Sequence, residues 1–219
     1  MISVVIPTDN SERLLPRCFD SLITAAVRGV VREVIVSDAG SGDTTLEIAD
    51  AAGAHIVHAR HGRCNQLTDG AAIARSDWLL FLHPETALEP GWEVEAESFI
   101  GQAVMERPRA AAFRFALEDF GGEARRAEAK AGLRTMLFAL PYGDQGLLIP
   151  KRLYQKIGGY RALADMEDAD IARRIGRRRL ISLRARALNV SRAPKSALRG
   201  AALILLHALR VPSRLLALL

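Results

Sequence analysis

Two side chains that suit a divalent cation lie two residues apart in this sequence. His83 and Glu85 follow directly on the apolar run of residues 77–82. An imidazole nitrogen and a carboxylate oxygen can bind Mg²⁺ or Mn²⁺, which usually share their coordination with substrate phosphates and water. Two candidate ligands are few, so a cation site and an ordinary polar loop both remain open.

The densest acidic cluster of the chain consists of Glu167, Asp168 and Asp170. Neighbouring carboxylates raise one another's pKa, which helps one of them to act as a general base. The same acids also suit the first turn of a helix, where the helix dipole stabilises negative charge. Spacing alone leaves both interpretations open.

A third group is the turn of residues 38–43, which contains Gly40 and Gly42. The glycines permit a tight turn and the close approach of a ligand, and Asp38 can accept hydrogen bonds from a ribose or a base N–H. The third glycine of a dinucleotide-binding fingerprint is absent. The alternative is a capped turn between a strand and a helix, because Asp and Gly are common in turns.

Two further pairs are weaker candidates: Arg63 with Gln66, and Asp144 with Gln145. An Arg near a binding crevice can hold a phosphate through two parallel hydrogen bonds. Taken one by one, such residues are more often solvated surface groups.

The elements that must position these residues alternate along the first 100 residues. Short apolar runs predict strands, and apolar side chains at helical spacing predict helices. This alternation is typical of an open, mostly parallel α/β sheet with helices on both faces, in which ligands bind beyond the carboxyl ends of the strands. We therefore expect segments 8–12, 38–43 and 83–86 to line one crevice. The predicted strands are 2–7, 33–37, 55–58, 77–82 and 110–117; the predicted helices are 14–27 with Ser11 as its N-cap, 44–52, 63–74, one introduced by Pro90, 123–140, 151–157 and 166–175.

The composition is that of a folded globular chain: 219 residues, 49% hydrophobic and 25% charged. Its charge is uneven. The last 49 residues hold 12 of the 30 Lys and Arg and no carboxylate, whereas the first 170 hold the other 18 against all 25 Asp and Glu. This +12 end after a −7 body predicts a surface that meets anions, such as membrane phosphates, nucleic acid or phosphorylated ligands.

Other classes of protein are disfavoured by composition. Two cysteines cannot form a disulfide framework or a Cys-rich metal site. The first residues lack the basic and long apolar regions of a signal peptide. Aromatic residues are sparse and no recognition motif for nucleic acid is present, which argues against that partner.

The order and spacing of these motifs resemble family 2 glycosyltransferases with the GT-A fold, whose first half is a Rossmann-like nucleotide-binding unit. The resemblance runs from Val4 to about Ala187 and is carried by segments 5–8, 36–44, 77–82, 158–160 and 167–168. More narrowly, the chain is similar to a bacterial branch often found beside selenium or radical-SAM related genes, through segments 62–66, 81–86, 141–146 and 166–170.

The resemblance implies an inverting transfer of a sugar from a nucleotide-diphosphate sugar to an acceptor hydroxyl. Asp168 would be the general base, and Glu85 would bind Mg²⁺ or Mn²⁺ together with the diphosphate. Gln145 and Glu167 would position the acceptor or the sugar. The Gln-x-x-Arg-Trp signature of processive relatives is absent, which implies a single transfer. The residues expected on the nucleotide side are Thr8, Glu12, Asp38, Arg63 and His83.

The chain departs from the branch at its metal motif. The branch usually shows His-Ala-Asp where this sequence has His83-Pro84-Glu85, and it usually has Asn at the position of Thr68. The alternative function is therefore a non-catalytic GT-A-like module that binds nucleotide with a degenerate metal motif. A nucleotidyltransferase is disfavoured, because segment 8–12 is acidic and lacks a Gly-rich, basic phosphate loop.

We expect a GT-A domain over residues 1–195 and a basic, apolar helical tail over residues 196–219. The tail either packs on the domain or lies on anionic lipid, where it would bring the site to a lipid-linked or phosphorylated acceptor. Its longest uncharged stretch, 200–209, has ten residues, and a spanning helix needs about 20. The predicted location is the cytoplasm, with at most a peripheral contact at the inner face of the membrane.

Overall fold

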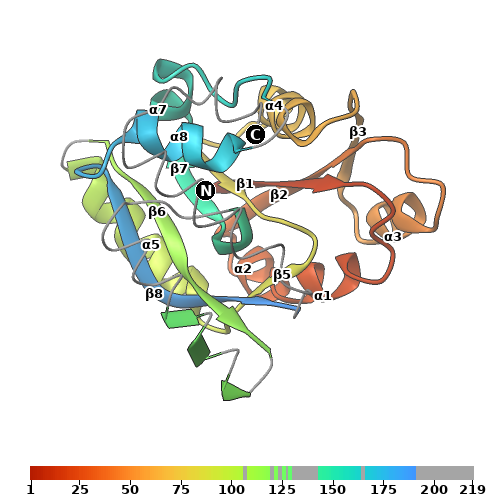
Figure 1. Ribbon diagram of the computed structural model, residues 1–219, viewed down its shortest axis with the longest axis horizontal. Helices are drawn as coiled ribbons and strands as arrows, with labels where there is room; N and C mark the ends of the chain where they lie inside the picture. Colours follow the sequence, from red (N-terminus) through yellow and green to blue (C-terminus); the bar gives the residue numbers. More distant parts are fainter. Residues whose placement is uncertain are drawn as a thin grey trace.

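The computed structural model describes residues 1–105, 108–118, 121–122, 125–126, 128–129, 143–163 and 166–190. Within these residues, eight strands form one sheet in the order β3-β2-β1-β4-β7-β6-β8-β5 (Figure 1). The strands are β1 (Ile2–Thr8), β2 (Val31–Asp38), β3 (His55–His58), β4 (Trp78–Phe81), β5 (Thr86–Leu88), β6 (Ala110–Leu117), β7 (Leu147–Pro150) and β8 (Leu180–Asn189).

The sheet has a parallel half and a mixed half. Strand β1 runs parallel to both β2 and β4, and β3 runs parallel to β2. Strand β7 is antiparallel to β4 and β6, while β8 runs parallel to β6 and antiparallel to β5. The predicted open, mostly parallel α/β sheet is therefore confirmed for strands β1 to β4, whose ends lead into the polar segments 8–12, 38–43 and 83–86.

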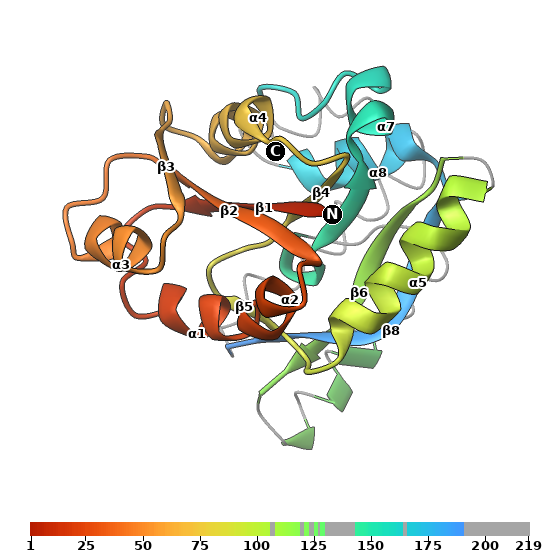
Figure 2. The same cartoon turned by 180° about the vertical axis from the view of Figure 1, so that it is seen from behind.

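Helices cover both faces of the sheet, as predicted. Helices α1, α2 and α5 lie on one face, and α4, α7 and α8 lie on the other (Figures 1 and 2). The helices are α1 (Leu15–Asp20), α2 (Ile23–Val27), α3 (Thr45–Ala51), α4 (Arg63–Ile73), α5 (Trp92–Met105), α7 (Lys151–Lys156) and α8 (Glu167–Ile175), with a short 3₁₀ helix, η1 (Gly143–Gln145).

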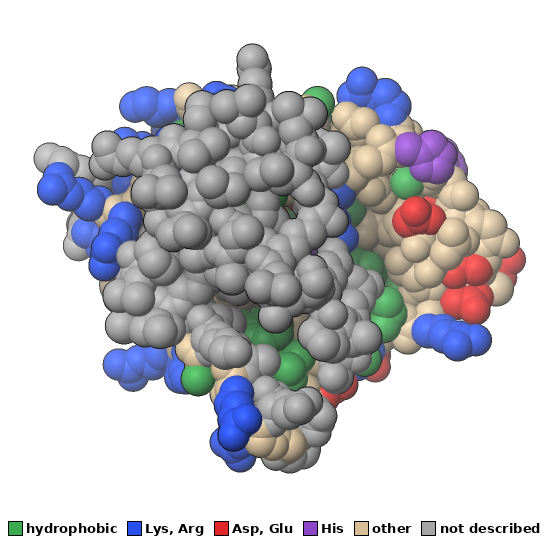
Figure 3. Space-filling view, in the orientation of Figure 1, with side chains coloured by type: hydrophobic (Ala, Val, Ile, Leu, Met, Phe, Trp, Pro, Cys, Tyr) green, Lys and Arg blue, Asp and Glu red, His purple; other side chains and the backbone are tan. Residues whose placement is uncertain are grey.

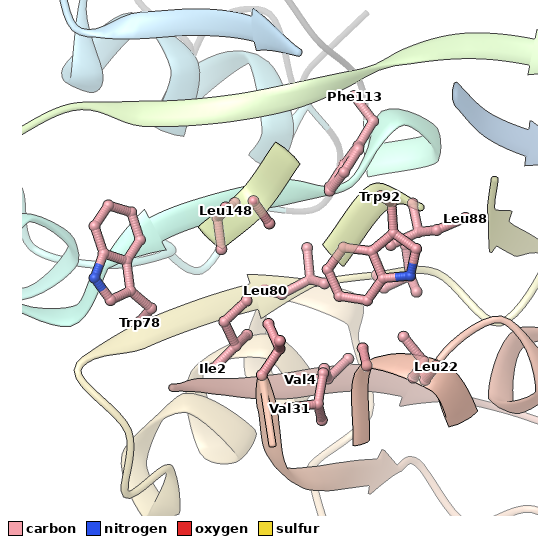
Figure 4. Close-up of a cluster of buried hydrophobic side chains, with 14 of the residues drawn as sticks. Ile2, Val4, Leu22, Val31, Trp78, Leu80, Leu88, Trp92, Phe113 and Leu148 are labelled. Carbon is pink, nitrogen blue, oxygen red and sulfur yellow. The ribbon is translucent and has the colours of Figure 1, made fainter. Parts of the chain in front are cut away.

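The β-branched runs of the central strands feed two separate cores. Because successive side chains of a strand point to opposite faces, Val4 packs with the α1, α2 and α5 side and Val5 with the α4, α7 and α8 side. The larger core is closed by Trp92 of α5, whose ring lies edge-on to Phe113 of β6 at 5.9 Å between centroids (Figure 4). Strands β1 and β4 are thus covered on both faces, which explains why their sequences are continuous apolar runs.

The structure corrects several predicted elements. The helix expected over 14–27 is two short helices, α1 and α2, and Ser11 is not its N-cap: its hydroxyl bonds to the carbonyl oxygen of Asp9 instead. Strands β5 and β7 were not predicted, and β8 is a ten-residue strand beyond the last predicted helix. The predicted helix 123–140 lies mostly outside the described residues, and the predicted tail 196–219 lies wholly outside them.

The uneven charge of the sequence is visible on the surface. In Figure 3, Lys and Arg occupy the left-hand margin without visible Asp or Glu, whereas on the right-hand side Asp and Glu appear together with Lys and Arg. Seven of the twelve cations that follow Asp170 lie within residues 173–186, in α8, β8 and the turn between them. More than half of the basic end therefore belongs to the folded domain and not to the predicted tail. No helix within the described ranges has the length and apolar character that crossing a membrane requires.

A carboxylate near the start of β2, that of Glu33, connects neighbouring elements. The side chain of Glu33 is only 6% exposed and accepts hydrogen bonds from Ser3 Oγ at 2.5 Å and Arg75 N at 2.6 Å. Burial alone would raise the pKa of Glu33, but these bonds and the nearby charges of Arg75 and His55 lower it below its ordinary 4.5. This carboxylate therefore ties β1, β2 and the end of α4 together in its ionised form.

Candidate active site

The carboxyl ends of β1 and β2 meet in a buried pair, Thr8 and Asp38. Their Cα atoms are partners in the parallel register, and Thr8 Oγ1 donates to Asp38 Oδ1 at 2.8 Å. The same carboxylate accepts from Ser41 Oγ at 2.6 Å and from the N–H groups of Gly40 and Ser41, each at 2.8 Å. Asp38 is fully buried, so it acts as the anchor of the turn that follows β2.

The hydrogen bonds decide the charge of Asp38. Burial alone would raise the pKa of this carboxyl, but the donors on Ser41, Thr8 and Gly40 lower it below its ordinary value. The carboxylate is therefore ionised at neutral pH, and four donors already surround its two oxygens. A carboxylate offers about four acceptor positions, so the turn itself uses the hydrogen-bonding capacity of Asp38.

The loops after β1 and β2 are joined to each other, as the crevice hypothesis requires. Glu12 accepts from the Thr44 hydroxyl at 3.0 Å, and Glu12 N donates to Asp43 Oδ2 at 3.1 Å. Asn10 N donates to Ser41 Oγ at 2.8 Å. Glu12, a predicted nucleotide-side residue, therefore lies within a single polar wall built from both loops.

Helix α4 brings two predicted residues to this wall. The sequence makes Gln66 a weak candidate, more typical of a surface group, but the structure buries it. Its Nε2 donates to Thr8 O at 2.6 Å and to Ser37 O at 3.0 Å, which fixes α4 against the ends of β1 and β2. Arg63 lies one turn earlier on the same helix, so this tether also sets the position of its guanidinium group.

Arg63 reaches across to the first turn of α8. Its Nη1 lies 3.5 Å from Glu167 Oε1, with the Arg side chain 42% exposed and the Glu side chain 8% exposed. Burial and the neighbouring charge of Asp168 raise the pKa of Glu167, while the charges of Arg63 and His83 act in the opposite direction. An ion pair with one exposed partner adds little to stability, so Arg63 can exchange this partner for another anion at small cost.

The turn after β4 holds the predicted metal pair. His83 and Glu85 are both buried, and His83 Nδ1 lies 3.8 Å from Glu85 Oε1. The backbone of the turn is fixed from α1, since Cys18 Sγ bonds to His83 O at 3.7 Å and Arg17 Nη1 donates to Glu85 O at 3.4 Å. The pair is therefore held rigidly beside the ends of β1 and β4.

The three acids of the predicted cluster have different surroundings. Asp170 is buried and binds Arg174, with 2.8 Å from Nε to Oδ2 and 2.5 Å from Nη2 to Oδ2. Its role is structural. Asp168 is half-buried on the first turn of α8, and its charge raises the pKa of both Glu167 and Tyr160.

Aromatic packing fixes this end of α8 beside β4. The ring of Phe81, the last residue of β4, lies 5.0 Å from that of Tyr160 and 5.2 Å from that of Tyr154. Gly159 has a φ of +59° and no room for a side chain, because a Cβ there would lie 3.0 Å from the Tyr154 ring. The segment 158–160 therefore packs against the end of β4. The charge of His83, in the turn after β4, acts on the pKa of Glu167 at the start of α8.

Gln145 is the last residue of η1, which precedes β7, the neighbour of β4 in the sheet. It is almost fully buried, and its Nε2 donates to Phe113 O at 3.0 Å. Part of the amide is therefore used to hold β6. Sequence reasoning missed the groups that fix this region, Arg17, Cys18, Thr86 and Asn189, because each belongs to an element distant in the chain from the residues that it binds.

Comparisons with known proteins show which sequences this chain resembles. Residues 3–96 match the family model described as glycosyl transferase family 2. A PGL/p-HBAD biosynthesis glycosyltransferase of Mycobacterium tuberculosis is 32% identical over 110 residues, which are 47% of this chain and 42% of that protein. The match therefore spans less than half the length of that relative.

Solved structures show the fold. Glucosyl-3-phosphoglycerate synthase of M. tuberculosis, crystallised with Mn²⁺, uridine diphosphate and glucosyl-3-phosphoglycerate, aligns with a TM-score of 0.64 at 21% identity, over 97% of this chain and 81% of that one. TarS of S. aureus aligns with a TM-score of 0.62 at 16% identity, over 94% and 65% of the two chains. The chain has the GT-A fold, as predicted, and its residues 3–96 carry the pattern of glycosyltransferase family 2.

Proposed function

We propose that this protein transfers a sugar from a nucleotide-diphosphate sugar to an acceptor hydroxyl, with inversion and in a single transfer. The observation that carries the proposal is the Arg63–Glu167 contact of 3.5 Å. It joins the polar wall at the ends of β1 and β2 to the acidic start of α8. In this proposal the polar wall binds the donor, and Asp168, the neighbour of Glu167 in α8, is the base.

The donor side consists of Thr8, Asp38, Glu12 and Arg63. Asp38 holds the turn beneath the nucleotide through its bonds to Gly40 and Ser41. Arg63 leaves Glu167 and binds the diphosphate, for which a guanidinium group is well suited. His83 lies beside the diphosphate, next to Glu85.

The residues present fit a divalent cation that shares its ligands with the donor. His83 Nδ1 and Glu85 Oε1 are 3.8 Å apart and both side chains are buried. Within the described ranges, no group of three or more His, Cys, Asp or Glu side chains is arranged to hold a metal, so the remaining ligands come from the diphosphate and water. Bound Mg²⁺ or Mn²⁺ supplies positive charge that stabilises the leaving diphosphate; the synthase noted above was crystallised with Mn²⁺ and uridine diphosphate.

Asp168 takes the proton from the acceptor hydroxyl as the acceptor oxygen bonds to the anomeric carbon. The bond from that carbon to the diphosphate breaks on the opposite face of the sugar, which inverts the configuration. Glu167, whose pKa is raised by burial and by Asp168, and Gln145 position the acceptor.

The acceptor in this proposal is phosphorylated or lipid-linked. The synthase with the similar fold was crystallised with glucosyl-3-phosphoglycerate, and the uneven charge of this chain favours an anionic acceptor. The proposal has two finer parts. Segment 196–219 contacts the inner face of the membrane, and the protein belongs to the bacterial branch found beside selenium or radical-SAM related genes. Deleting residues 196–219 should abolish binding to anionic vesicles; unchanged binding would refute the membrane contact.

The test is nucleotide-sugar turnover by wild-type protein and by Asp168→Asn. Wild type is incubated with UDP- and GDP-sugars, Mn²⁺ and either 3-phosphoglycerate or water as acceptor. Asp168→Asn should lose at least ~100-fold in turnover, the usual contribution of a general base, and bind nucleotide as wild type does. Asp50→Asn, an exposed change on α3, is the matched control. Failure of wild type to bind any nucleotide sugar would refute the function, and full activity of Asp168→Asn would refute the base.

A non-catalytic nucleotide-binding module is the second candidate. It is favoured by the metal pair, which supplies two ligands and includes the stiff Pro84 between them. Nucleotide binding that neither depends on Mn²⁺ nor leads to turnover would support this alternative over transfer.

A further inference from the structure

Asn189, the last residue of β8, joins two parts of the proposed active site that belong to different elements. Its side chain is 4% exposed and makes three hydrogen bonds. Nδ2 donates to Asp144 O at 2.7 Å and to Ala187 O at 3.0 Å. Oδ1 accepts from the Thr86 hydroxyl at 2.7 Å.

The partners of Asn189 are the immediate neighbours of two site residues. Thr86 follows Glu85 in the turn of residues 83–86, and Asp144 precedes Gln145 in η1. The antiparallel register of β5 and β8 sets Thr86 opposite Asn189. One buried amide therefore binds the cation-side turn with its oxygen and the acceptor-side helix with its nitrogen.

A second contact fixes the same junction. Arg17 of α1 donates to Glu85 O and to Leu188 O, both at 3.4 Å, and forms an ion pair with Glu118. The backbone of the turn and the backbone beside Asn189 are thus held by one guanidinium group. The turn and the end of β8 are thus adjacent, and the amide of Asn189 links both of them to η1.

We propose that Asn189 is a positioning residue, which sets the turn of residues 83–86 against η1 and so orients Glu85 toward the divalent cation. The inference rests on the proposed function. The role requires a donor and an acceptor on one short side chain, which Asn supplies. An Asp keeps the bond from Thr86, but it brings a carboxylate oxygen against the Asp144 carbonyl without a hydrogen between them.

Two variants separate the halves of this connection. Thr86→Val removes the bond on the turn side and keeps the amide. Asn189→Asp keeps the bond to Thr86 and removes both bonds of Nδ2, to Asp144 O in η1 and to Ala187 O. The affinity of the UDP-bound protein for Mn²⁺ is measured from the electron paramagnetic resonance signal of free Mn²⁺, and the affinity for UDP is measured without metal.

Both variants should weaken Mn²⁺ binding about tenfold, the lower end of what loss of an outer partner of a metal ligand costs, and leave metal-free UDP binding unchanged. A new carboxylate near a cation would by itself strengthen binding, so weakening in Asn189→Asp reports displaced geometry. Gln102→Glu, the same chemical change at an exposed position of α5, is the control and should bind Mn²⁺ as wild type does.

The outcomes separate this inference from the proposed function. If wild type binds UDP and Mn²⁺ and turns over a nucleotide sugar, but Asn189→Asp stays within twofold of the wild-type Mn²⁺ affinity, the positioning role is wrong and the function stands. If wild type binds no nucleotide, both fail. Should Asn189→Asp not fold, Thr86→Val decides: unchanged Mn²⁺ affinity in that variant overturns the proposal, and a tenfold loss sustains it.

Discussion

Gly70, in the middle of α4, is where the helix comes nearest to the sheet. A Cβ at this position would lie 2.5 Å from Cγ1 of Val5 and 3.4 Å from Cβ of Ser37. Apolar carbon atoms rest at about 3.5–4.0 Å, so Gly70→Ala creates an overlap of about 1 Å with Val5. The strand cannot yield, because Val5 is fully buried in β1 and β-branched side chains are stiff. The helix must therefore move away from the sheet.

The cost of this movement can be estimated from three effects. Overpacking of a core costs about 1–3 kcal/mol. Moving α4 outward by about 1 Å lengthens the bonds from Gln66 to Thr8 O and Ser37 O, now 2.6 and 3.0 Å, each of which contributes about 1 kcal/mol. The helix propensity of Ala returns about 1 kcal/mol. The net loss is about 3 kcal/mol, or a fall in Tm of roughly 6–12 °C for a chain of this size.

Thermal and urea unfolding of Gly70→Ala measure this loss, and Gly101→Ala is the matched control. Gly101 lies within α5, and a Cβ added there would have no heavy atom within 4 Å beyond its own helix backbone and chain neighbours. The same substitution at Gly101 should therefore stabilise the protein by up to about 1 kcal/mol. Gly70→Ala should also weaken UDP binding, because Gln66 and Arg63 move with the helix. A Tm of Gly70→Ala equal to or above wild type, with the expected gain in Gly101→Ala, would refute the close packing of α4 as the reason for this glycine.

Three further predictions concern buried charges and a second glycine. Glu167→Gln should raise Tm at pH 8 and lose this gain near pH 4, because a raised pKa means that folding disfavours the ionised form. Glu33→Gln should lower Tm at pH 7, because the pKa of Glu33 is lowered and its ionised form stabilises the fold. The difference in Tm between wild type and variant should narrow as the pH falls below 4.5. A difference that stays constant in thermal unfolding scans across pH would contradict this. Gly159→Ala should cost about 1–3 kcal/mol more than Gly158→Ala in urea unfolding, since both have positive φ but only Gly159 is crowded, by Tyr154.

The sequence predicted the fold best where local pattern and tertiary environment agree. Strands β1 to β4 and helices α3 and α4 lie within a few residues of their predicted bounds, because strands covered on both faces read as apolar runs. Strands β5 and β7 were missed because they have three and four residues. Their strand character comes from antiparallel pairing with β8 and β4, partners that are distant in the sequence.

The location of the candidate site was predictable for a related reason. Thr8 and Asp38 end their strands and His83 follows β4, and these strands are neighbours in one sheet, so topology alone brings the three residues to one edge. The partner of each polar group was not predictable. Gln66 has the pattern of a surface residue because nothing in its own helix shows that two carbonyl groups of other strands lie beneath it.

The same distinction explains why acidic motifs were harder to interpret than glycines or apolar runs. A carboxylate in a motif suits a ligand and a protein donor equally well, and only its partners decide between them. Asp170 is bound by Arg174 and Asp38 is surrounded by four donors of its own turn, so both act first on the fold. Glu167 differs, because burial and the adjacent charge of Asp168 raise its pKa despite the nearby Arg63. Glu167 and Asp168 oppose each other's ionisation, so keeping them adjacent lowers the stability of the folded protein. Pairs of this kind are often found at catalytic sites.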